Sequence, residues 1–432
     1  MKKIFQYIML AVVTIVMASC TSDIEETTAT TGKSNVQLVV GEFPVFGDSQ
    51  TRAIGTPDEG KTSWAEGDEL LLEMTSKTLG TKYAAFKYNG SSWELASGEL
   101  SYKEDEVPTF PHVYYAPNYK WEAGKLVLKE GKVAGTDEYI EGKANITPNG
   151  EAITVKFAEA TRNYSRLRIA TMPNKQITVA FNNRYTPAGS SVNAIFPRYT
   201  LTSDEKGNAY LYGTFGQYCD FEVKYEGAPL ASHTFYQAAE NAKSYVLDAT
   251  VVSLTDEGIT YDQIVEDVKK ELDAGKTYIN LMLAPDADEE TLDAIHIGLQ
   301  DARYGSINLT LIGCKKIPSR GFMHFDMLKS IVLPDVTEIE GKAFSDCTWL
   351  KKVVLGNLTK VYGNVGKNGI FDGCRTEDID LVLSKDQKVM NGGEAEGKYC
   401  WTADIIKDYS GSDEHDGRVF LGYEFQSVTC DY

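Results

Sequence analysis

The sequence predicts a mainly β protein in which two antiparallel β-sandwiches are followed by a short stack of parallel α/β repeats. Two observations predict this class. From Val36 to about Ala249, short alternating segments rich in Tyr, Val, Thr and Phe follow one another without helical periodicity. From Thr260 the apolar period changes, and similar segments then recur along the chain. An N-terminal leader precedes both regions.

The leader has three parts, a basic start at Lys2 and Lys3, an apolar run from Ile4 to Val16, and small residues before Cys20. A run of about 13 residues is shorter than the roughly 20 that span a bilayer, so residues 1–19 are predicted to be a secretory signal. The ending resembles the lipobox of bacterial lipoproteins, which implies that Cys20 carries the lipid (palmitate among its acyl chains). A plain signal peptide cleaved near Cys20 is the alternative.

Residues 20–35 are predicted to be an acidic flexible tether. They contain Asp23, Glu25 and Glu26 among many Thr and Ser, with almost no apolar residue to bury. An acidic cluster behind the lipid cysteine resembles the surface-export signal of Bacteroidota lipoproteins, and this implies a surface-exposed position on the cell outer membrane. A merely solvated linker is the alternative reading.

The charge of the chain excludes some classes of partner. Its formal net charge is −19, and removal of residues 1–19 with their two lysines lowers it to −21. This balance argues against nucleic acid and against docking on anionic lipid head groups. With 42% apolar and 11% aromatic residues, the chain has enough apolar side chains for substantial cores.

The front half reads as two antiparallel sandwiches, residues 36–145 and 146–250, with a break expected near Gly142 to Gly150. The clearest local signal is Asn89-Gly90, which separates the apolar-alternating segments 83–88 and 92–95. Asn-Gly between two such segments predicts a tight β-hairpin.

Short sequence motifs in this half resemble those of the fimbrillin-like surface lipoproteins of Bacteroidota. They are Thr51-Arg52-Ala53, the segment from Trp64 to Leu70, and the segment from Val113 to Pro117. The resemblance covers about half of the chain; one departure is Ala158-Glu159, where the family often has a histidine. It implies other fimbrial subunits as partners and cleavage after Arg52 to free a groove for a neighbour's strand. An ordinary exposed loop arginine is the alternative. The segment from Trp64 to Asp68 also has a purely structural interpretation, a turn before a strand with the Trp as a core anchor.

The back half begins with two helix–strand units. Thr260 and Gln263 form a capping-box pattern, and apolar residues then recur every four positions up to Gly275. A strand at 279–283, a second helix at about 289–303 and a strand at 307–311 follow. Because the two strands are nearly identical, lie 28 residues apart and each follow a helix, we expect a parallel stack.

Shorter units continue this region at similar steps, first from Phe322 to Phe344 and then from Phe344 to Phe371. The segment from Ala343 to Leu355 resembles the BspA-type leucine-rich repeat of bacterial surface proteins, and both steps lie within the length range of leucine-rich repeats. The predicted repeat core comprises Phe322, Leu328, Ile331, Leu333, Phe344, Cys347, Leu350, Val353, Leu355, Phe371 and Cys374.

The two repeat cysteines, Cys347 and Cys374, occupy the position that Phe325 holds in the first unit. We interpret them as small buried spacers rather than metal or redox groups. The leucine-rich-repeat domain is expected to span residues 251–398, with a C-terminal cap at 399–432 in which a Cys400–Cys430 disulfide remains open. Such stacks leave a lateral strand face open for a partner.

The sequence contains no pattern typical of catalysis. Its five histidines are scattered without metal-ligand spacing, the segment 363–367 lacks the spacing of a phosphate loop, and the acidic residues at 286–290 fit a helix N-terminus better than a calcium loop. We therefore expect no enzyme activity, no cofactor and no metal.

These observations lead to one functional expectation and one alternative. The first is a surface-exposed outer-membrane lipoprotein that acts in adhesion or recognition, as a minor or tip component of a fimbria, and binds a protein or glycan on host or bacterial surfaces. The alternative is a glycan-binding lipoprotein of an outer-membrane nutrient-uptake system. The identity of the ligand and the ability to polymerise remain open at this point.

Overall fold

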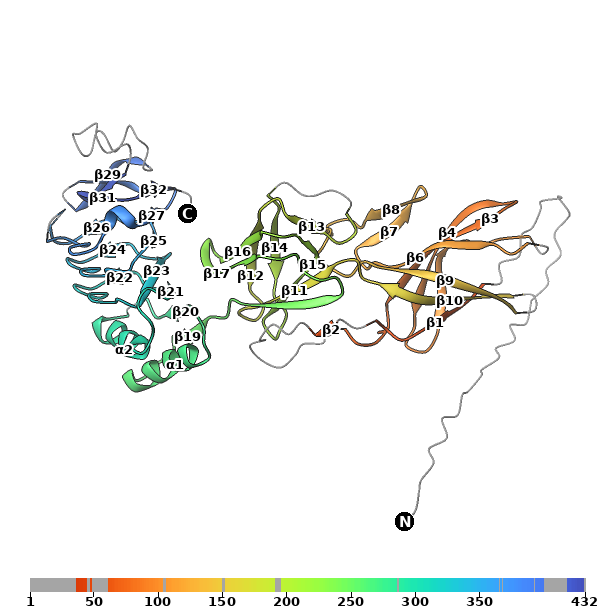
Figure 1. The fold of residues 1–432 in the computed structure, drawn as a ribbon, viewed down its shortest axis with the longest axis horizontal. Helices are drawn as coiled ribbons and strands as arrows, with labels where there is room; N and C mark the ends of the chain where they lie inside the picture. Colours follow the sequence, from red (N-terminus) through yellow and green to blue (C-terminus); the bar gives the residue numbers. More distant parts are fainter. Residues whose placement is uncertain are drawn as a thin grey trace, which may run out of the picture.

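The computed structural model describes residues 36–44, 47–48, 61–103, 106–149, 152–190, 196–285, 287–364, 366, 368–391, 393–399 and 418–430. The expected lipid site Cys20, the tether, the cleavage candidate Arg52 and the cysteine Cys400 lie outside these residues. The predicted mainly β class is confirmed, and the described part contains many strands and two α-helices. The strands form three units arranged along one long axis (Figure 1).

The first unit is built on a seven-stranded sheet with the strand order β1-β10-β9-β6-β3-β4-β5. The strands are β1 (Val36–Val40), β3 (Glu69–Ser76), β4 (Gly80–Tyr88), β5 (Trp93–Gly98), β6 (Thr109–Tyr115), β9 (Ile140–Asn149) and β10 (Ala152–Thr161). Alternate side chains of β3 enter separate cores, Leu70 and Leu72 on one face and Leu71 on the other. The ribbon of β7 (Tyr119–Glu122) and β8 (Lys125–Leu128) contributes to the second core.

Two sequence signals of this unit have clear structural counterparts. Trp64 packs edge-on against Phe43, Trp93 and Tyr115, with ring centroids 4.9 to 5.1 Å apart. Gly67 takes a positive φ of 96° in the turn that precedes β3. The Asn89-Gly90 hairpin is confirmed, because β4 and β5 pair antiparallel across it. The segment from Trp64 therefore has a sufficient structural role.

The expected boundary between residues 145 and 146 is wrong. Strand β9 runs through it and pairs antiparallel with β10, which in turn pairs in parallel with β1 at the edge of the sheet. Gly142, taken as a break, stays within β9 opposite Val113. The first unit therefore extends to Thr161. The sequence does carry a turn signal here, since Asn149-Gly150 stands between the two strands and Ala152 pairs with Asn149.

The middle unit has two facing sheets, with orders β13-β15-β11-β18-β2 and β14-β12-β16-β17. The strands are β2 (Gly47–Asp48), β11 (Ser165–Ala170), β12 (Gln176–Phe181), β13 (Tyr185–Pro187), β14 (Arg198–Thr202), β15 (Asn208–Phe215), β16 (Cys219–Tyr225), β17 (Ala228–Phe235) and β18 (Lys243–Asp248). Leu167 and Ile169 of one sheet and Val179 and Val223 of the other share a single core. The N-terminal segment thus supplies edge strands to two units, since β2 pairs with β18.

The third unit, which we call the parallel stack, contains a seven-stranded sheet with the order β19-β20-β21-β23-β25-β27-β32, and every neighbouring pair in it is parallel. The strands are β19 (Val252–Leu254), β20 (Tyr278–Leu283), β21 (Ile307–Ile312), β23 (Leu328–Leu333), β25 (Lys352–Leu355), β27 (Asp380–Val382) and β32 (Ser427–Thr429). We call this the main sheet of the stack.

A second sheet and two helices complete the parallel stack. The second sheet contains β22 (Lys316–Ile317), β24 (Glu338–Ile339), β26 (Lys360–Val361), β28 (Lys388–Asn391) and β29 (Glu394–Tyr399). Two short strands, β30 (Val419–Phe420) and β31 (Tyr423–Glu424), and a short 3₁₀ helix, η1 (Thr376–Asp378), lie near the C-terminal end.

Helix α1 (Tyr261–Asp273) begins at the predicted capping box, in which Thr260 and Gln263 bond reciprocally. Helix α2 (Glu289–Leu299) starts at Asp288, which accepts a hydrogen bond from Thr291 N, and it ends before the expected Arg303. Strands β20 and β21 pair in parallel as predicted, with Ile279 opposite Leu309.

Candidate functional site

The predicted repeat core lies inside the parallel stack. All of its members are buried except Cys374, which is half-buried. Phe322, Phe344 and Phe371 form a ladder of nearly parallel rings with centroids 5.3 and 5.2 Å apart. Strand pairing follows the aligned units, since Ile331 lies opposite Val353. These residues position the surface of the stack and do not themselves reach a ligand.

The two repeat cysteines have structural partners. The thiol of Cys347 donates to the carbonyl of Phe322 at 2.9 Å, and the thiol of Cys374 donates to the carbonyl of Phe344 at 2.8 Å. The hydrogen bond with Cys374, together with burial, raises the pKa of Cys347 well above its ordinary value. Cys347 is therefore held as a neutral thiol, which is a poor nucleophile and a poor metal ligand.

The outward face of the main sheet is partly covered by the chain itself. Edge strand β17 of the middle unit contacts β20, β21 and β23. Ala228 forms a small buried cluster with Val332 and Val354, and Ile312 enters the core of the middle unit. The expectation of a fully open lateral face is therefore wrong for these strands. The cause is the hairpin of β16 and β17, whose two-residue turn at 226–227 has positive φ at both residues and brings Ala228 onto the sheet.

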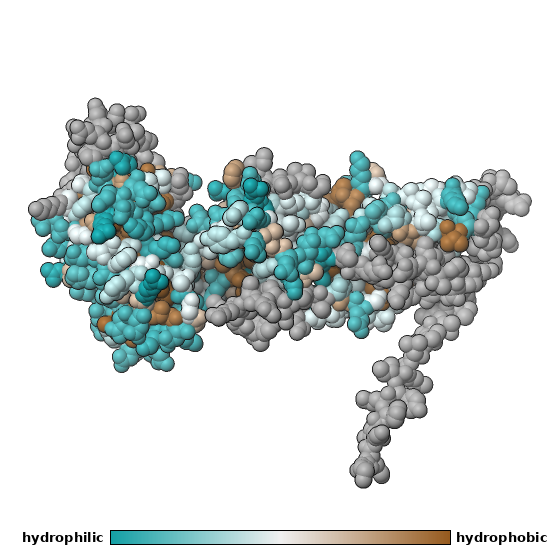
Figure 2. Space-filling model, viewed as in Figure 1, coloured by the Kyte–Doolittle hydropathy of each residue, from teal (hydrophilic) through white to brown (hydrophobic). Residues whose placement is uncertain are grey.

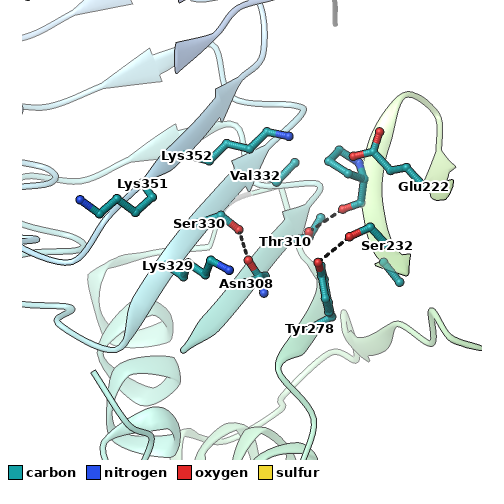
Figure 3. Close-up of a pocket in the computed structure, with 12 residues that line it drawn as sticks. Glu222, Ser232, Tyr278, Asn308, Thr310, Lys329, Ser330, Val332, Lys351 and Lys352 are labelled. Atoms are coloured by element: carbon teal, nitrogen blue, oxygen red, sulfur yellow. Dashed lines mark hydrogen bonds between the residues drawn. The ribbon is translucent and has the colours of Figure 1, made fainter. Parts of the chain in front are cut away.

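A cleft of about 140 Å³ remains beside this contact, between β16–β17 and the main sheet (Figure 3). Its walls carry paired hydroxyl and amide groups. The hydroxyls of Ser232 and Tyr278 hydrogen-bond to each other at 2.7 Å, and Ser330 donates to Asn308 at 2.7 Å. Thr310 donates to the carbonyl of Pro229 at 2.9 Å and so satisfies one backbone acceptor of edge strand β17. We call this space the junction cleft.

Three lysines of the stack line the junction cleft, and they differ in orientation and pairing. In Figure 3, Lys329 and Lys352 extend toward the cleft, whereas Lys351 extends away from it. Lys351 forms an ion pair with Asp378 at 2.8 Å. Within the described part of the chain, Lys329 and Lys352 form no ion pair. Two ammonium groups therefore remain available at this wall.

The opposite wall of the junction cleft carries Glu222, which forms an ion pair with Lys224 at 2.9 Å. The floor is apolar at Val332, next to the backbone of Pro229. The exposed lining is largely apolar and its hydroxyl and amide groups are already paired, so the two unpaired ammonium groups are the feature that favours a ligand with negative charge.

A buried lysine holds the junction together at one end. Lys276 forms ion pairs with Asp248 at 2.8 Å and with Glu271 at 2.5 Å, and its side chain is 9% exposed. Asp248 ends the last strand of the middle unit, while Glu271 belongs to helix α1. Burial alone lowers the pKa of Lys276, but hydrogen bonds and charge from the two carboxylates outweigh it, so the pKa lies above the ordinary lysine value.

Sequence reasoning did not identify the junction cleft. Its lining comes from three separate parts of the chain, and only their packing brings Ser232 and Tyr278 together. One usable signal was present, since Lys329 and Lys351 occupy equivalent positions in two successive repeats. A charged residue repeated on the outer side of a stack indicates a surface row, although not what lies opposite.

Other expectations concern groups with ordinary structural roles. His296 is half-buried on α2, with its ring centroid 4.0 Å from that of Phe325. Asp288 caps α2, as expected for a helix N-terminus. Among the described residues, no group of three or more His, Cys, Asp or Glu side chains is arranged to hold a metal ion. None of the helices in the same residues is long and apolar enough to cross a membrane.

Comparison with protein-family models gives no match for this chain, and comparison with curated proteins gives no significant match.

Proposed function

We propose that this protein is a surface-exposed outer-membrane lipoprotein that acts in adhesion or recognition, with a ligand-binding surface on its third unit. The observation that carries this proposal is the order of the units along the long axis. The first strand after the acidic tether, β1, belongs to the unit farthest from the parallel stack (Figure 1). A chain anchored at Cys20 would hold the stack away from the membrane, where a protein or glycan on another cell is accessible.

The proposal includes a finer description of the fold. We infer that the first two units are fimbrillin-like β-sandwich subdomains and that the parallel stack is a short α/β leucine-rich-repeat solenoid with residues 399–432 as its cap. The two facing sheets of the middle unit and the ladder of Phe322, Phe344 and Phe371 support this description. Phe425, buried 5.3 Å from the ring of Phe371, closes the end of that ladder.

A place in a fimbria, as a minor or tip subunit, forms part of the same proposal. Strands β1 and β2 both precede Arg52 in the sequence, and each lies at the edge of a sheet. Cleavage after Arg52, which the resemblance implies, would release both strands and expose the edges of β10 and β18 to a strand from another subunit. An Arg52→Ala variant should then remain uncut and unassembled on the cell surface. If the mature parent protein and the mature variant both keep the mass of the uncleaved chain, cleavage is removed from the proposal.

The adhesion proposal is tested on cells that display the chain. We expect cells with the full chain to adhere to host or bacterial surfaces, and cells with a chain that ends at Thr250 to lose adhesion. Protease resistance of the shortened chain is the control for folding, because the truncation exposes the surface that β17 contributes to the junction. Equal adhesion by a folded, shortened chain would contradict a binding surface on the third unit.

The anchor is tested separately. Cys20→Ala should leave an unacylated protein that no longer partitions into detergent, and normal membrane retention of this variant would contradict the lipid assignment.

A second candidate function, glycan capture for an outer-membrane uptake system, is favoured by one observation. Tyr304 and Trp349 expose their rings side by side on the stack, 65% and 50% exposed. Exposed parallel rings suit the faces of sugars. Loss of growth on one polysaccharide in a strain that lacks the protein, with adhesion unchanged, would favour this second function.

A further inference from the structure

The exposed ring pair lies on the amino-terminal side of strands β21 and β25. The ring centroids of Tyr304 and Trp349 are 6.5 Å apart, and their planes differ by 26°. Glycine suits position 305, because its φ is +61° and a Cβ there would lie only 3.1 Å from the Cβ of Trp349. The backbone therefore lets Trp349 lie flat beside Tyr304 with both rings in solvent.

The visible face of the molecule in Figure 2 is mainly hydrophilic, with small and scattered apolar patches. Large apolar patches commonly mark protein-binding surfaces. The exposed rings of Tyr304 and Trp349 instead offer two flat contact areas for a ligand that is itself largely polar.

The ring pair and the lysine wall of the junction cleft lie on neighbouring segments of the stack. Gly305 N donates to Asp326 O and Ile307 N donates to Met327 O, each at 2.9 Å, so the segment of Tyr304 lies beside the segment that leads into Lys329. Trp349 precedes Lys352 by three residues, a span of at most about 11 Å along the backbone. The rings therefore lie on the amino-terminal side of the two strands that carry Lys329 and Lys352, within reach of an extended ligand.

The charge of this surface is unusual for the chain. In a protein with a formal charge of −19, Lys329 and Lys352 face the cleft without an ion pair among the described residues. The nearest acidic group by strand register is Asp380, opposite Lys352, and it accepts a hydrogen bond from Ser427 at 2.5 Å. Glu222 across the cleft is paired with Lys224. The lysine wall is thus a local site for an anion.

We propose that the junction cleft and the adjoining Tyr304–Trp349 pair bind an acidic oligosaccharide, a chain of pyranose rings that carry carboxylates. This inference rests on the proposed recognition function and names its ligand class. The aromatic rings stack on pyranose faces, Lys329 and Lys352 pair with carboxylates, and the terminal sugar enters the cleft among the hydroxyls of Ser232 and Tyr278. Binding at a seam between units also makes the site dependent on both units.

An acidic peptide satisfies the lysines but uses the rest of the surface less well. Its backbone presents no flat rings to Tyr304 and Trp349, and its flexible chain loses more conformational entropy on binding than a stiff sugar chain does. The cleft of about 140 Å³ has room for a single small unit. An acidic oligosaccharide is therefore the proposed ligand, and binding of an acidic peptide is one outcome of the experiment.

The test measures binding to the full chain in detergent micelles by titration calorimetry and tryptophan fluorescence. The probes are tetragalacturonate and tetraglucuronate, with the methyl esters of both and tetraglutamate as comparisons. We expect at least one of the acidic tetrasaccharides to bind and its methyl ester, which keeps the rings but loses the charge, to bind at least about tenfold more weakly. Binding of the acidic form should weaken with added salt.

Two variants separate the roles of charge and stacking. The double variant Lys329→Gln/Lys352→Gln should weaken the acidic form at least about tenfold and leave the weak binding of the ester unchanged. Trp349→Ala should weaken both forms. Lys206→Gln, at an exposed turn of the middle unit, is the matched control and should change neither.

The proposal is overturned if neither acidic tetrasaccharide binds at millimolar concentration, if acid and ester bind alike, or if the double variant binds like the parent. Tetraglutamate that binds as tightly as the sugars would assign the site to acidic peptides and overturn the sugar assignment. These failures are distinguishable from failure of the proposed function. Adhesion of displayed cells that persists while all sugar binding is absent rejects only the ligand class.

Discussion

The middle unit is joined to its two neighbours in different ways. Toward the first unit, Arg162 forms a two-pronged ion pair with Glu138 at 2.9 and 2.8 Å, and their side chains are only 2% and 6% exposed. Arg162 also donates to the carbonyl of Pro44 at 2.6 Å, while the hydroxyl of Tyr164 donates to Glu138. Toward the parallel stack, hydroxyl pairs and Lys276 make the contact, and a cleft remains open.

The difference shows how one chain combines a tightly paired junction with one that leaves a cleft open. A buried ion pair with further hydrogen bonds tolerates almost no other geometry, since any shift leaves a charge without a partner. Gly189 adds to this precision, because a Cβ there would lie 2.5 Å from the hydroxyl oxygen of Tyr119. The second junction combines the ion pairs of Lys276 at one end with neutral groups beside the cleft, such as Ser232 and Tyr278, which can also bond to water.

The largest effect is expected from Arg162→Met, which leaves the buried carboxylate of Glu138 without its cation. We expect a loss of about 3–5 kcal/mol in the free energy of unfolding of the two front units, measured by urea titration. The double variant Arg162→Met/Glu138→Leu should recover much of this loss, because it removes both charges. If Arg162→Met is as stable as the parent, the buried ion pair does not stabilise the first junction.

The second junction should lose less when its own lysine is changed. Lys276→Met removes two ion pairs, but the carboxylates of Asp248 and Glu271 remain 12% and 15% exposed and gain access to water. We expect a loss of about 2 kcal/mol, together with a wider distribution of distances between the middle unit and the stack in small-angle scattering. A variant with an unchanged scattering profile would show that β17 alone fixes the junction.

Lys276 should also make the stability of the second junction depend on pH in the alkaline range. Its pKa is raised above the ordinary lysine value in the folded protein, so the protonated form is the stabilised one. The contribution is complete below the ordinary lysine pKa and is lost as the pH rises through the folded pKa. The parent should therefore lose more stability than Lys276→Met as the pH is raised. Thermal unfolding at each pH measures this loss. Parallel losses in both proteins would contradict this assignment.

A smaller effect is expected from Thr310→Val at the same junction. The substitution keeps the shape of the side chain but leaves the carbonyl of Pro229 without its donor. A lost hydrogen bond of this kind costs about 1 kcal/mol in the free energy of unfolding. Ser253→Val, at an exposed hydroxyl of β19 away from the cleft, is the matched control and should cost less. Equal stability of parent and Thr310→Val would mean that water replaces the hydroxyl.

The stack and the two junctions differ in how well the sequence predicts them. The apolar residues of the stack were assigned correctly because each unit repeats its neighbour, so Val353 lies opposite Ile331 as the alignment expects. The pairing of β1 with β10 joins segments far apart in the chain, and no local pattern encodes it. The junction cleft depends on such pairings twice over, since it requires the position of β17 and the register of the main sheet.

The smallest effect is expected at acidic pH, and it concerns the stability of the parallel stack rather than that of either junction. Burial lowers the pKa of His296 below its ordinary value, and His324 acts in the same direction, while Asp293 and Asp326 oppose them without reversing the shift. The unfolded chain therefore binds a proton at this residue at higher pH than the folded chain does. Stability contributed by the neutral ring is present above the ordinary histidine pKa and is lost as the pH falls through it toward the folded pKa.

We expect His296→Phe, which keeps a ring beside Phe325, to flatten the decline in urea midpoint between about pH 7.5 and about pH 5. His233→Phe is the comparison, because burial also lowers the pKa of His233, but this residue lies in the middle unit. If each variant flattens only the transition of its own unit, the stack and the middle unit unfold separately despite the shared junction. If both variants flatten one common transition, the seam transmits stability, and the contrast between a sealed and an open junction concerns ligand access rather than cooperativity.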